Sequence, residues 1–236
     1  MTFTTFTESL NFSDMDMMAL LFFLLLWALY TFLADHSKYK TRAISHLMDG
    51  QRLRWLTEAA NREMRMIDTG VLKILVTGIS FFASSTILVL GGLIAAMGYS
   101  EQLAVAFAHI PLAKPLTADG FVVRVGLLVG IFIYAFFKFA WAFRIANYCA
   151  IVIGGMSDSR YDEDKAARMK RASVAAKLSS ASGHHFNRGI RAYFFALAGL
   201  TWFVGPLVFM SATLAVVFVL TRREFTSRAV KLVREL

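Results

Sequence analysis

The sequence has few charged residues, few prolines and a single cysteine. Charged residues make up 17% of its 236 residues, whereas a soluble domain has about 25%. One cysteine excludes a secreted scaffold held together by disulfides. Hydrophobic residues make up 57%, including 22 Phe, and the mean hydropathy is +0.57. This composition excludes a disordered or coiled-coil chain, and it exceeds what one soluble core can bury, so it predicts apolar surface that faces lipid.

Three apolar stretches are long enough to cross a membrane completely: residues 17–34, 71–98 and 121–155. A hydrocarbon core about 30 Å thick needs roughly 20 residues of helix. The first stretch is preceded by acidic residues and has no basic start, which favours an uncleaved anchor over a signal peptide. The third stretch would reach about 52 Å as a helix, so we expect it to continue beyond the membrane for two or three turns.

A fourth apolar stretch, residues 192–220, is interrupted at its middle by Gly205-Pro206. Proline removes a backbone donor and glycine permits a sharp turn. We favour a re-entrant helical hairpin with arms 187–204 and 206–221, and one kinked span is the alternative. The expected fold is therefore an all-α, polytopic transmembrane helical bundle in a single domain.

Basic residues are distributed unevenly between the apolar stretches. The segment 35–70 holds seven Lys and Arg and the segment 156–191 holds eight, whereas 99–120 holds only Lys114. The positive-inside rule then places the N-terminus outside and both basic segments in the cytoplasm. The tail 221–236 is also basic, which favours the hairpin because only a reversal returns the tail to the cytoplasm.

The two cytoplasmic segments are expected to differ in structure. Leu53, Leu56, Ala60 and Met64 recur at three- and four-residue spacing, so segment 35–70 is predicted to be an amphipathic helix with a basic face. Segment 156–191 is predicted to contain a surface helix over 162–177, followed by a loop at 179–183.

Small and hydroxyl side chains gather in the second span: Ser80, Ser84, Ser85, Gly91 and Gly92. Small residues at four-residue spacing let helices approach closely in lipid, and serine can bond to its own helix carbonyls. These residues are candidates for tight helix packing, which we favour, or for a polar lining of a pore or pocket.

Three cations interrupt the third apolar stretch, at Arg124, Lys138 and Arg144. Arg124 and Lys138 lie within reach of opposite headgroup layers, so both are expected to snorkel. Arg144 and Asn147 lie on the extension beyond the membrane and need another partner. We favour a buried ion pair for Arg144 over a contact with a substrate or ion. The nearest suitable carboxylates are Asp35, Asp49 and Asp68.

The last polar cluster lies at 184–193. Arg188 and Arg191 share one helix face, which suits lipid phosphate, a bound anion or simple positive-inside anchoring. His184 and His185 are adjacent, so on a helix they point about 100° apart and do not form a shared metal clamp. We therefore predict no metal site, no cofactor and no catalytic residue, because the sequence also lacks the common enzyme motifs. Membrane topology explains the basic charge, so no nucleic-acid partner is expected.

Several short motifs together resemble one family, the integral membrane proteins of bacteria and plants named domain of unknown function 599. The motifs are Ala34-Asp35-His36, Arg54-Trp55, Asn61-Arg62 with Asp68, Ser80–Ser84, Tyr134–Phe139, Asn147-Tyr148-Cys149, His185–Gly189, Arg191-Ala192-Tyr193 and Arg222–Phe225. The resemblance implies an integral protein of the bacterial inner membrane, and it implies no activity, substrate or cofactor.

Two functional hypotheses from different classes follow. The first is a small oligomeric channel or carrier, with an anion as substrate because Lys138, Arg144 and Arg188 are cationic. The second is a non-catalytic accessory or organising subunit that binds other membrane proteins or anionic lipid. A membrane-embedded enzyme using His184 or His185 as acid or base is the third and least favoured. The expected partners are the lipid bilayer and either further copies of the chain or another membrane protein.

Overall fold

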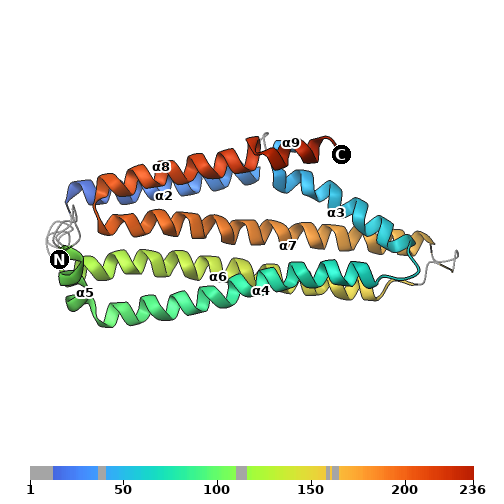
Figure 1. Ribbon diagram of the computed structural model, residues 1–236, viewed down its shortest axis with the longest axis horizontal. Coiled ribbons are helices and arrows are strands. Elements are labelled where there is room, and N and C mark those ends of the chain that lie inside the picture. The colour runs from blue at the N-terminus through green and yellow to red at the C-terminus, as the bar shows by residue number, and fades with distance from the viewer. Residues whose placement is uncertain (1–12, 37–40, 110–115, 158–159, 161–164) are drawn as a thin grey trace. The chain divides into compact units, whose positions relative to one another are not determined.

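The computed structural model describes residues 13–36, 41–109, 116–157, 160 and 165–236. Lys38, Lys40 and Lys114, which the charge count used, and residues 162–164 of the predicted surface helix lie outside the described residues. The described chain is all-α and contains no strand. Its helices are α2 (Asp14–His36), α3 (Ile44–Asn61), α4 (Met66–Gly98), α5 (Ser100–Ala108), α6 (Ala118–Gly154), α7 (Lys165–Leu200), α8 (Pro206–Thr221) and α9 (Arg228–Arg234) (Figure 1).

Four helical segments are long and apolar enough to cross a membrane: α2, α4, α6 and the segment Pro206–Arg234. The protein is therefore a multi-pass membrane protein, as the composition predicts. With 33 and 37 residues, α4 and α6 reach about 50 and 55 Å, far more than the roughly 30 Å of a hydrocarbon core. Both helices must continue beyond the membrane, which for α6 agrees with the predicted overhang.

The chain divides into two compact units, which we describe separately. Unit 1 comprises Met1–Lys38, Thr86–Ala135 and Arg191–Arg223. Unit 2 comprises Tyr39–Ser85, Phe136–Ile190 and Glu224–Leu236. Each of the three long helices, α4, α6 and α7, contributes residues to both units.

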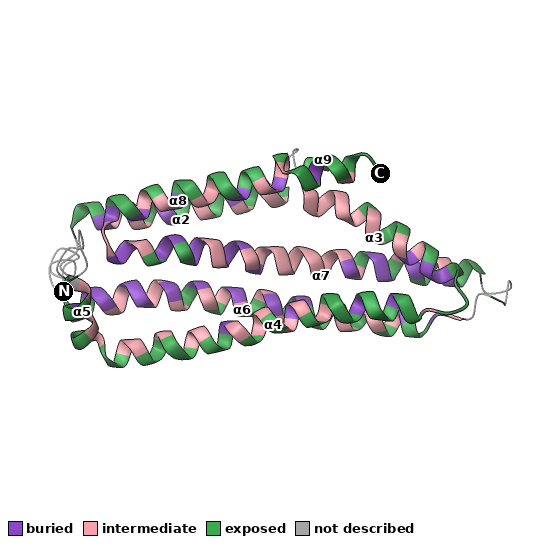
Figure 2. Ribbon diagram, viewed as in Figure 1, coloured by how far each residue is buried: buried purple, intermediate pink, exposed green. Residues whose placement is uncertain are grey.

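In unit 1, α2 and α8 run side by side (Figure 1). Their interface is aromatic: the ring centroid of Phe23 on α2 lies 4.9 Å from that of Phe209 on α8, and 5.7 Å from that of Phe195 on α7. All three rings are fully buried. Close packing of this kind holds helices together in lipid, where no hydrophobic effect drives their association. The opposite faces of α2 and α8 are exposed (green in Figure 2), as lipid-facing surfaces should be.

The chain reverses direction at Gly205-Pro206. Pro206 occupies the first turn of α8, where its missing N–H is tolerated. The Arg223 guanidinium lies 5.4 Å from the ring centroid of Phe194, although a single helix would separate these positions by about 43 Å. The chain therefore forms a helical hairpin and not one kinked helix. Its second arm together with the tail, Pro206–Arg234, is long enough to cross a membrane completely, so the hairpin need not be re-entrant.

The first arm of this hairpin is much longer than expected, because α7 runs unbroken from Lys165 to Leu200. The predicted loop at 179–183 was wrong. Serine and glycine are poor helix formers in isolation, but here their small size permits packing: Ser182 is buried, and its Oγ donates to the Ala142 carbonyl at 2.8 Å. Figure 2 shows α7 mostly buried or half-buried along its length.

The core of unit 2 is built largely from alanines, so its helices approach closely. Leu56, Ala59 and Ala60 of α3 belong to the same buried cluster as Ala172, Ala175 and Ala176 of α7. Of the predicted apolar face of α3, Leu56 and Ala60 are buried, whereas Leu53 is exposed and Met64 lies beyond the end of the helix. α9 packs on α3, where Arg234 donates to the Arg42 carbonyl at 3.0 Å.

Candidate functional site

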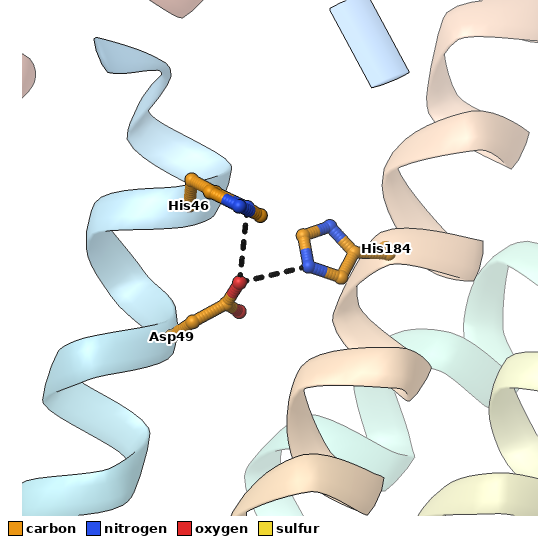
Figure 3. A group of neighbouring side chains, drawn as sticks. All are labelled: His46, Asp49 and His184. Atoms are coloured by element: carbon orange, nitrogen blue, oxygen red, sulfur yellow. Dashed lines mark hydrogen bonds and ion pairs between the residues drawn. The ribbon is translucent and has the colours of Figure 1, made fainter. Parts of the chain in front are cut away.

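Two histidines and one aspartate from different helices of unit 2 meet around a single carboxylate oxygen (Figure 3). His46 and Asp49 lie one turn apart on α3, and His184 projects from α7. Asp49 Oδ2 is 3.2 Å from His46 Nδ1 and 2.9 Å from His184 Nε2. All three side chains are half-buried, so the cluster is accessible from solvent.

Asp49 is held as a carboxylate by its neighbours. Burial raises the pKa of Asp49, but hydrogen bonds from His184 and Ser180 and the charges of His184 and Arg52 lower it further, so that the pKa lies below its usual value. Arg52 lies one turn along α3, and its Nη1 donates to Asp49 Oδ1 at 3.0 Å. The two carboxylate oxygens therefore have different partners: Oδ1 accepts a hydrogen bond from Arg52, and Oδ2 faces both imidazoles.

Arg52 lies directly over Gly183 of α7. A Cβ atom added to Gly183 would lie 2.5 Å from Arg52 Nη2, so a larger residue at this position would displace the guanidinium. The glycine that suggested a loop in the sequence thus makes room for a charged side chain from another helix.

A pocket of about 210 Å³ lies beside Arg52. Its walls come from α4, α6 and α7 and are mainly apolar, including Leu72, Ile79, Cys149 and Phe186. Arg52 is the charged residue in the lining, and Ser179, Ser182 and Asn187 are the other polar ones. A second depression of about 470 Å³ shares Leu72 and Val76 with this pocket and contains Arg65 and Lys73. The combination of apolar walls and nearby cations suits an amphiphile with a negative head.

The structure contains buried ion pairs, but not the one predicted for Arg144. Arg144 is exposed and contacts Tyr148 one turn along α6, through its Nε and over the ring. The prediction was wrong because the buried face of α6 passes through Ala142, Ala146 and Cys149, and Arg144 lies on the exposed side of the helix.

The three candidate aspartates are all paired, each with a different cation. Asp35 accepts from Arg191 at 2.7 Å, Asp68 accepts from Arg62 at 2.6 Å, and Asp49 belongs to the cluster above. Arg191 also lies 5.9 Å from the ring centroid of Tyr30. Arg191 is therefore a structural residue of unit 1, with its charge balanced by a buried carboxylate.

Arg124 does not snorkel as expected. It is buried, and its Nη2 donates to Asp16 Oδ1 at 3.0 Å, while the Trp202 Nε1 donates to the same oxygen at 2.9 Å. This pair is not predictable from the sequence, in which Asp16 is simply part of the acidic flank before the first apolar stretch. Of the remaining predicted site residues, Lys138, Asn147 and Arg188 are half-buried.

The candidate hydroxyl and small residues of α4 line neither of the two pockets described above. Ser80 and Ser85 donate to the carbonyls of Val76 and Phe81 in their own helix. Ser84, Gly91 and Gly92 are exposed, and a Cβ added to either glycine would meet no atom within 4 Å. This face of α4 is thus open to lipid or to another protein.

Comparison with known proteins identifies a family. A family model described as "Protein of unknown function, DUF599" matches residues 18–229, which is nearly the whole chain. No curated protein and no solved structure matches significantly.

Proposed function

The chain belongs to the DUF599 family, and we propose that it is a non-catalytic membrane protein that binds an anionic phospholipid in the pocket of unit 2. The observation that carries this proposal is the position of Arg52 in the lining of an otherwise mainly apolar pocket. Apolar walls accept an acyl chain, and a guanidinium binds phosphate through paired hydrogen bonds.

The size of the pocket supports partial entry of the lipid. Sites that enclose a whole drug-sized ligand are about 300–1,000 Å³, so a pocket of about 210 Å³ suits one segment of an acyl chain. The adjoining depression, with Lys73 and Arg65 in its lining, accommodates the rest of the molecule. Each basic residue near an anionic membrane surface adds about 1 kcal/mol to the attraction.

The proposal includes an orientation in a bacterial inner membrane. The N-terminus lies outside, and the basic segments 35–70, 156–191 and 221–236 lie in the cytoplasm. Asp16 and Asp35 support the position of the membrane, because both belong to buried ion pairs of unit 1 and their spacing on α2 is about 28 Å, close to the thickness of a hydrocarbon core. The contact between α9 and α3 supports a cytoplasmic tail. A reporter fused after Leu236 tests this orientation directly, and an external signal would reject it.

Lipid selectivity tests the proposed function. The full chain, purified in mild detergent, is mixed with phosphatidylglycerol or phosphatidylcholine, and native mass spectrometry and thermal unfolding report retained lipid and stabilisation. We expect preferential retention of phosphatidylglycerol and its loss in Arg52→Ala. Arg54→Ala is the matched control, because Arg54 is exposed on the same helix and does not line the pocket.

A second variant tests the apolar part of the pocket. Gly78 lines the pocket, and a Cβ added there meets no atom within 4 Å, so Gly78→Leu should fill space without a clash. We expect it to reduce lipid retention although Arg52 is intact. Equal retention of both lipids, or equal losses in Arg52→Ala and Arg54→Ala, would reject the pocket in favour of general surface electrostatics.

The channel or carrier is the alternative function. Its candidate cations, Lys138, Arg144 and Arg188, line neither of the described pockets. For this reason we favour lipid binding. The exposed Gly91 and Gly92 face supports association with another membrane helix, from a second copy or from a different protein. Anion flux into liposomes that is lost in Arg144→Ala and Lys138→Ala would favour transport over the accessory role.

A further inference from the structure

We propose that His46, Asp49 and His184 form a binding site for a divalent transition-metal ion, with zinc as the ion that fits the ligands best. This site adjoins the lipid pocket through Arg52, but it requires no occupant there. It combines two imidazoles and one carboxylate, which is a ligand set found in zinc sites that keep an open coordination position.

The distances between the ligand atoms fit a metal. Bonds of about 2.0–2.1 Å in a tetrahedral site place neighbouring ligand atoms roughly 3.3 Å apart. The two measured distances to Asp49 Oδ2 are 3.2 and 2.9 Å, and all three candidate ligand atoms lie within 4.8 Å of one another. An ion therefore needs only small side-chain rotations to contact all three.

The surroundings of Asp49 place its Oδ2 atom toward the two histidines. Arg52 donates a hydrogen bond to Oδ1 of the carboxylate, and such a bond from outside the coordination sphere orients a metal ligand. Oδ2 faces both imidazoles and is the oxygen positioned to bind the metal with them. The positive charge of the Arg52 guanidinium also disfavours the binding of a second cation, so the site should hold a single ion.

The exposure of the cluster leaves room for water. The side chains of His46, Asp49 and His184 retain 36%, 25% and 29% of their accessible surface, so an ion can enter from solvent and complete its coordination with water. A buried structural zinc site, in contrast, is closed by four protein ligands. The geometry therefore indicates exchangeable binding rather than a metal required for folding.

The competing explanation is a hydrogen-bonded clasp, in which both imidazoles donate to Asp49 and merely join α3 to α7. The clasp needs two N–H donors but no metal affinity. A variant that keeps the donor and removes the metal ligand separates the two explanations. His184→Gln provides it, because a side-chain amide still donates to Asp49 but is a poor zinc ligand.

The experiment uses the full chain in detergent, purified without a polyhistidine tag and treated with a chelator. Cobalt(II) is the probe, because its visible absorption reports coordination, and zinc then displaces it in competition. We expect one ion per chain. Affinity should fall in His46→Ala, His184→Ala and His184→Gln by more than the roughly 10- to 100-fold that follows loss of a residue that only hydrogen-bonds to a metal ligand.

His185→Ala is the matched control, because His185 neighbours His184 on α7 and lies outside the cluster. It should retain cobalt, and circular dichroism should show that all variants keep their helices. Absence of saturable binding, or equal affinity in wild type and His184→Gln, would overturn the metal site and leave the clasp. Because these measurements contain no added lipid, their failure is distinguishable from failure of the proposed function.

Discussion

Unit 1 and unit 2 use aspartate in different ways. In unit 1, Asp16 is buried and Asp35 is nearly so, and each is matched by one buried arginine. In unit 2, Asp49 is half-buried and is surrounded by Arg52 and two histidines beside a pocket. A buried one-to-one pair has no capacity for a ligand, whereas an accessible carboxylate with several partners does. Burial, rather than residue type, therefore separates structural charges from candidate functional ones.

Asp68 shows that the role of an aspartate depends on its burial and not on the unit to which it belongs. It lies in unit 2 but is fully buried, and it accepts from the Trp55 indole at 2.7 Å and from Arg62 at 2.6 Å. We accordingly assign it to the structure of unit 2 and exclude it from the candidate site.

The largest expected effect on stability follows from the loss of a buried carboxylate in unit 1. Asp16→Ala leaves the Arg124 guanidinium buried without its carboxylate partner, and breaking a buried pair in this way costs about 3–5 kcal/mol. Unfolding by a denaturing detergent, followed by circular dichroism, measures the loss. Asp14→Ala is the control, since Asp14 is exposed in the same turn and should change stability by less than about 0.5 kcal/mol. Equal effects of the two variants would contradict a structural role for the pair.

The next largest expected effect is a loss of stability through disturbed packing in unit 2. A Cβ at Gly189 would overlap the ring of Phe139, which is fully buried. Because the ring cannot move away, Gly189→Ala should destabilise the protein by about 1–3 kcal/mol. Gly91→Ala, which meets open space, should instead be neutral or stabilising through helix propensity. The two thermal midpoints should therefore shift in opposite directions, or only that of Gly189→Ala should fall.

Gly183→Ala separates stability from binding at the candidate site. Its Cβ meets the end of the flexible Arg52 side chain, which can rotate away, so the expected destabilisation is less than about 1 kcal/mol. The displaced guanidinium should nevertheless reduce phosphatidylglycerol retention nearly as far as Arg52→Ala does. Unchanged lipid retention, with Arg52→Ala still defective, would show that the position of the guanidinium over α7 is unimportant.

The smallest effect is expected at Arg144. This side chain is exposed and interacts with Tyr148 on its own helix, so Arg144→Ala should change the free energy of unfolding by about 0.5 kcal/mol or less. Arg191→Ala, which removes a buried partner of Asp35, should cost several times more. Comparable losses in both variants would indicate a contact of Arg144 outside a single chain.

The sequence predicts the architecture well and the candidate site poorly. Apolar length identifies the spans, and Gly205-Pro206 together with the basic tail indicates the reversal. The loop predicted at 179–183 failed because local propensity takes no account of a neighbouring helix that needs small residues. The meeting of His184 with His46 and Asp49 could not be predicted from the sequence, because these partners lie more than a hundred positions earlier, on α3.

By itself, the sequence determined that this chain is helical, crosses a membrane several times and reverses before its end. These properties depend on the length of apolar runs and on local charge, which are additive along the chain. Only the tertiary structure decided that Arg124 pairs with Asp16, that Arg144 faces outward and that His46 meets His184. Such pairings depend on the rotation of each helix about its axis, and that rotation is set by the packing of the side chains between the helices.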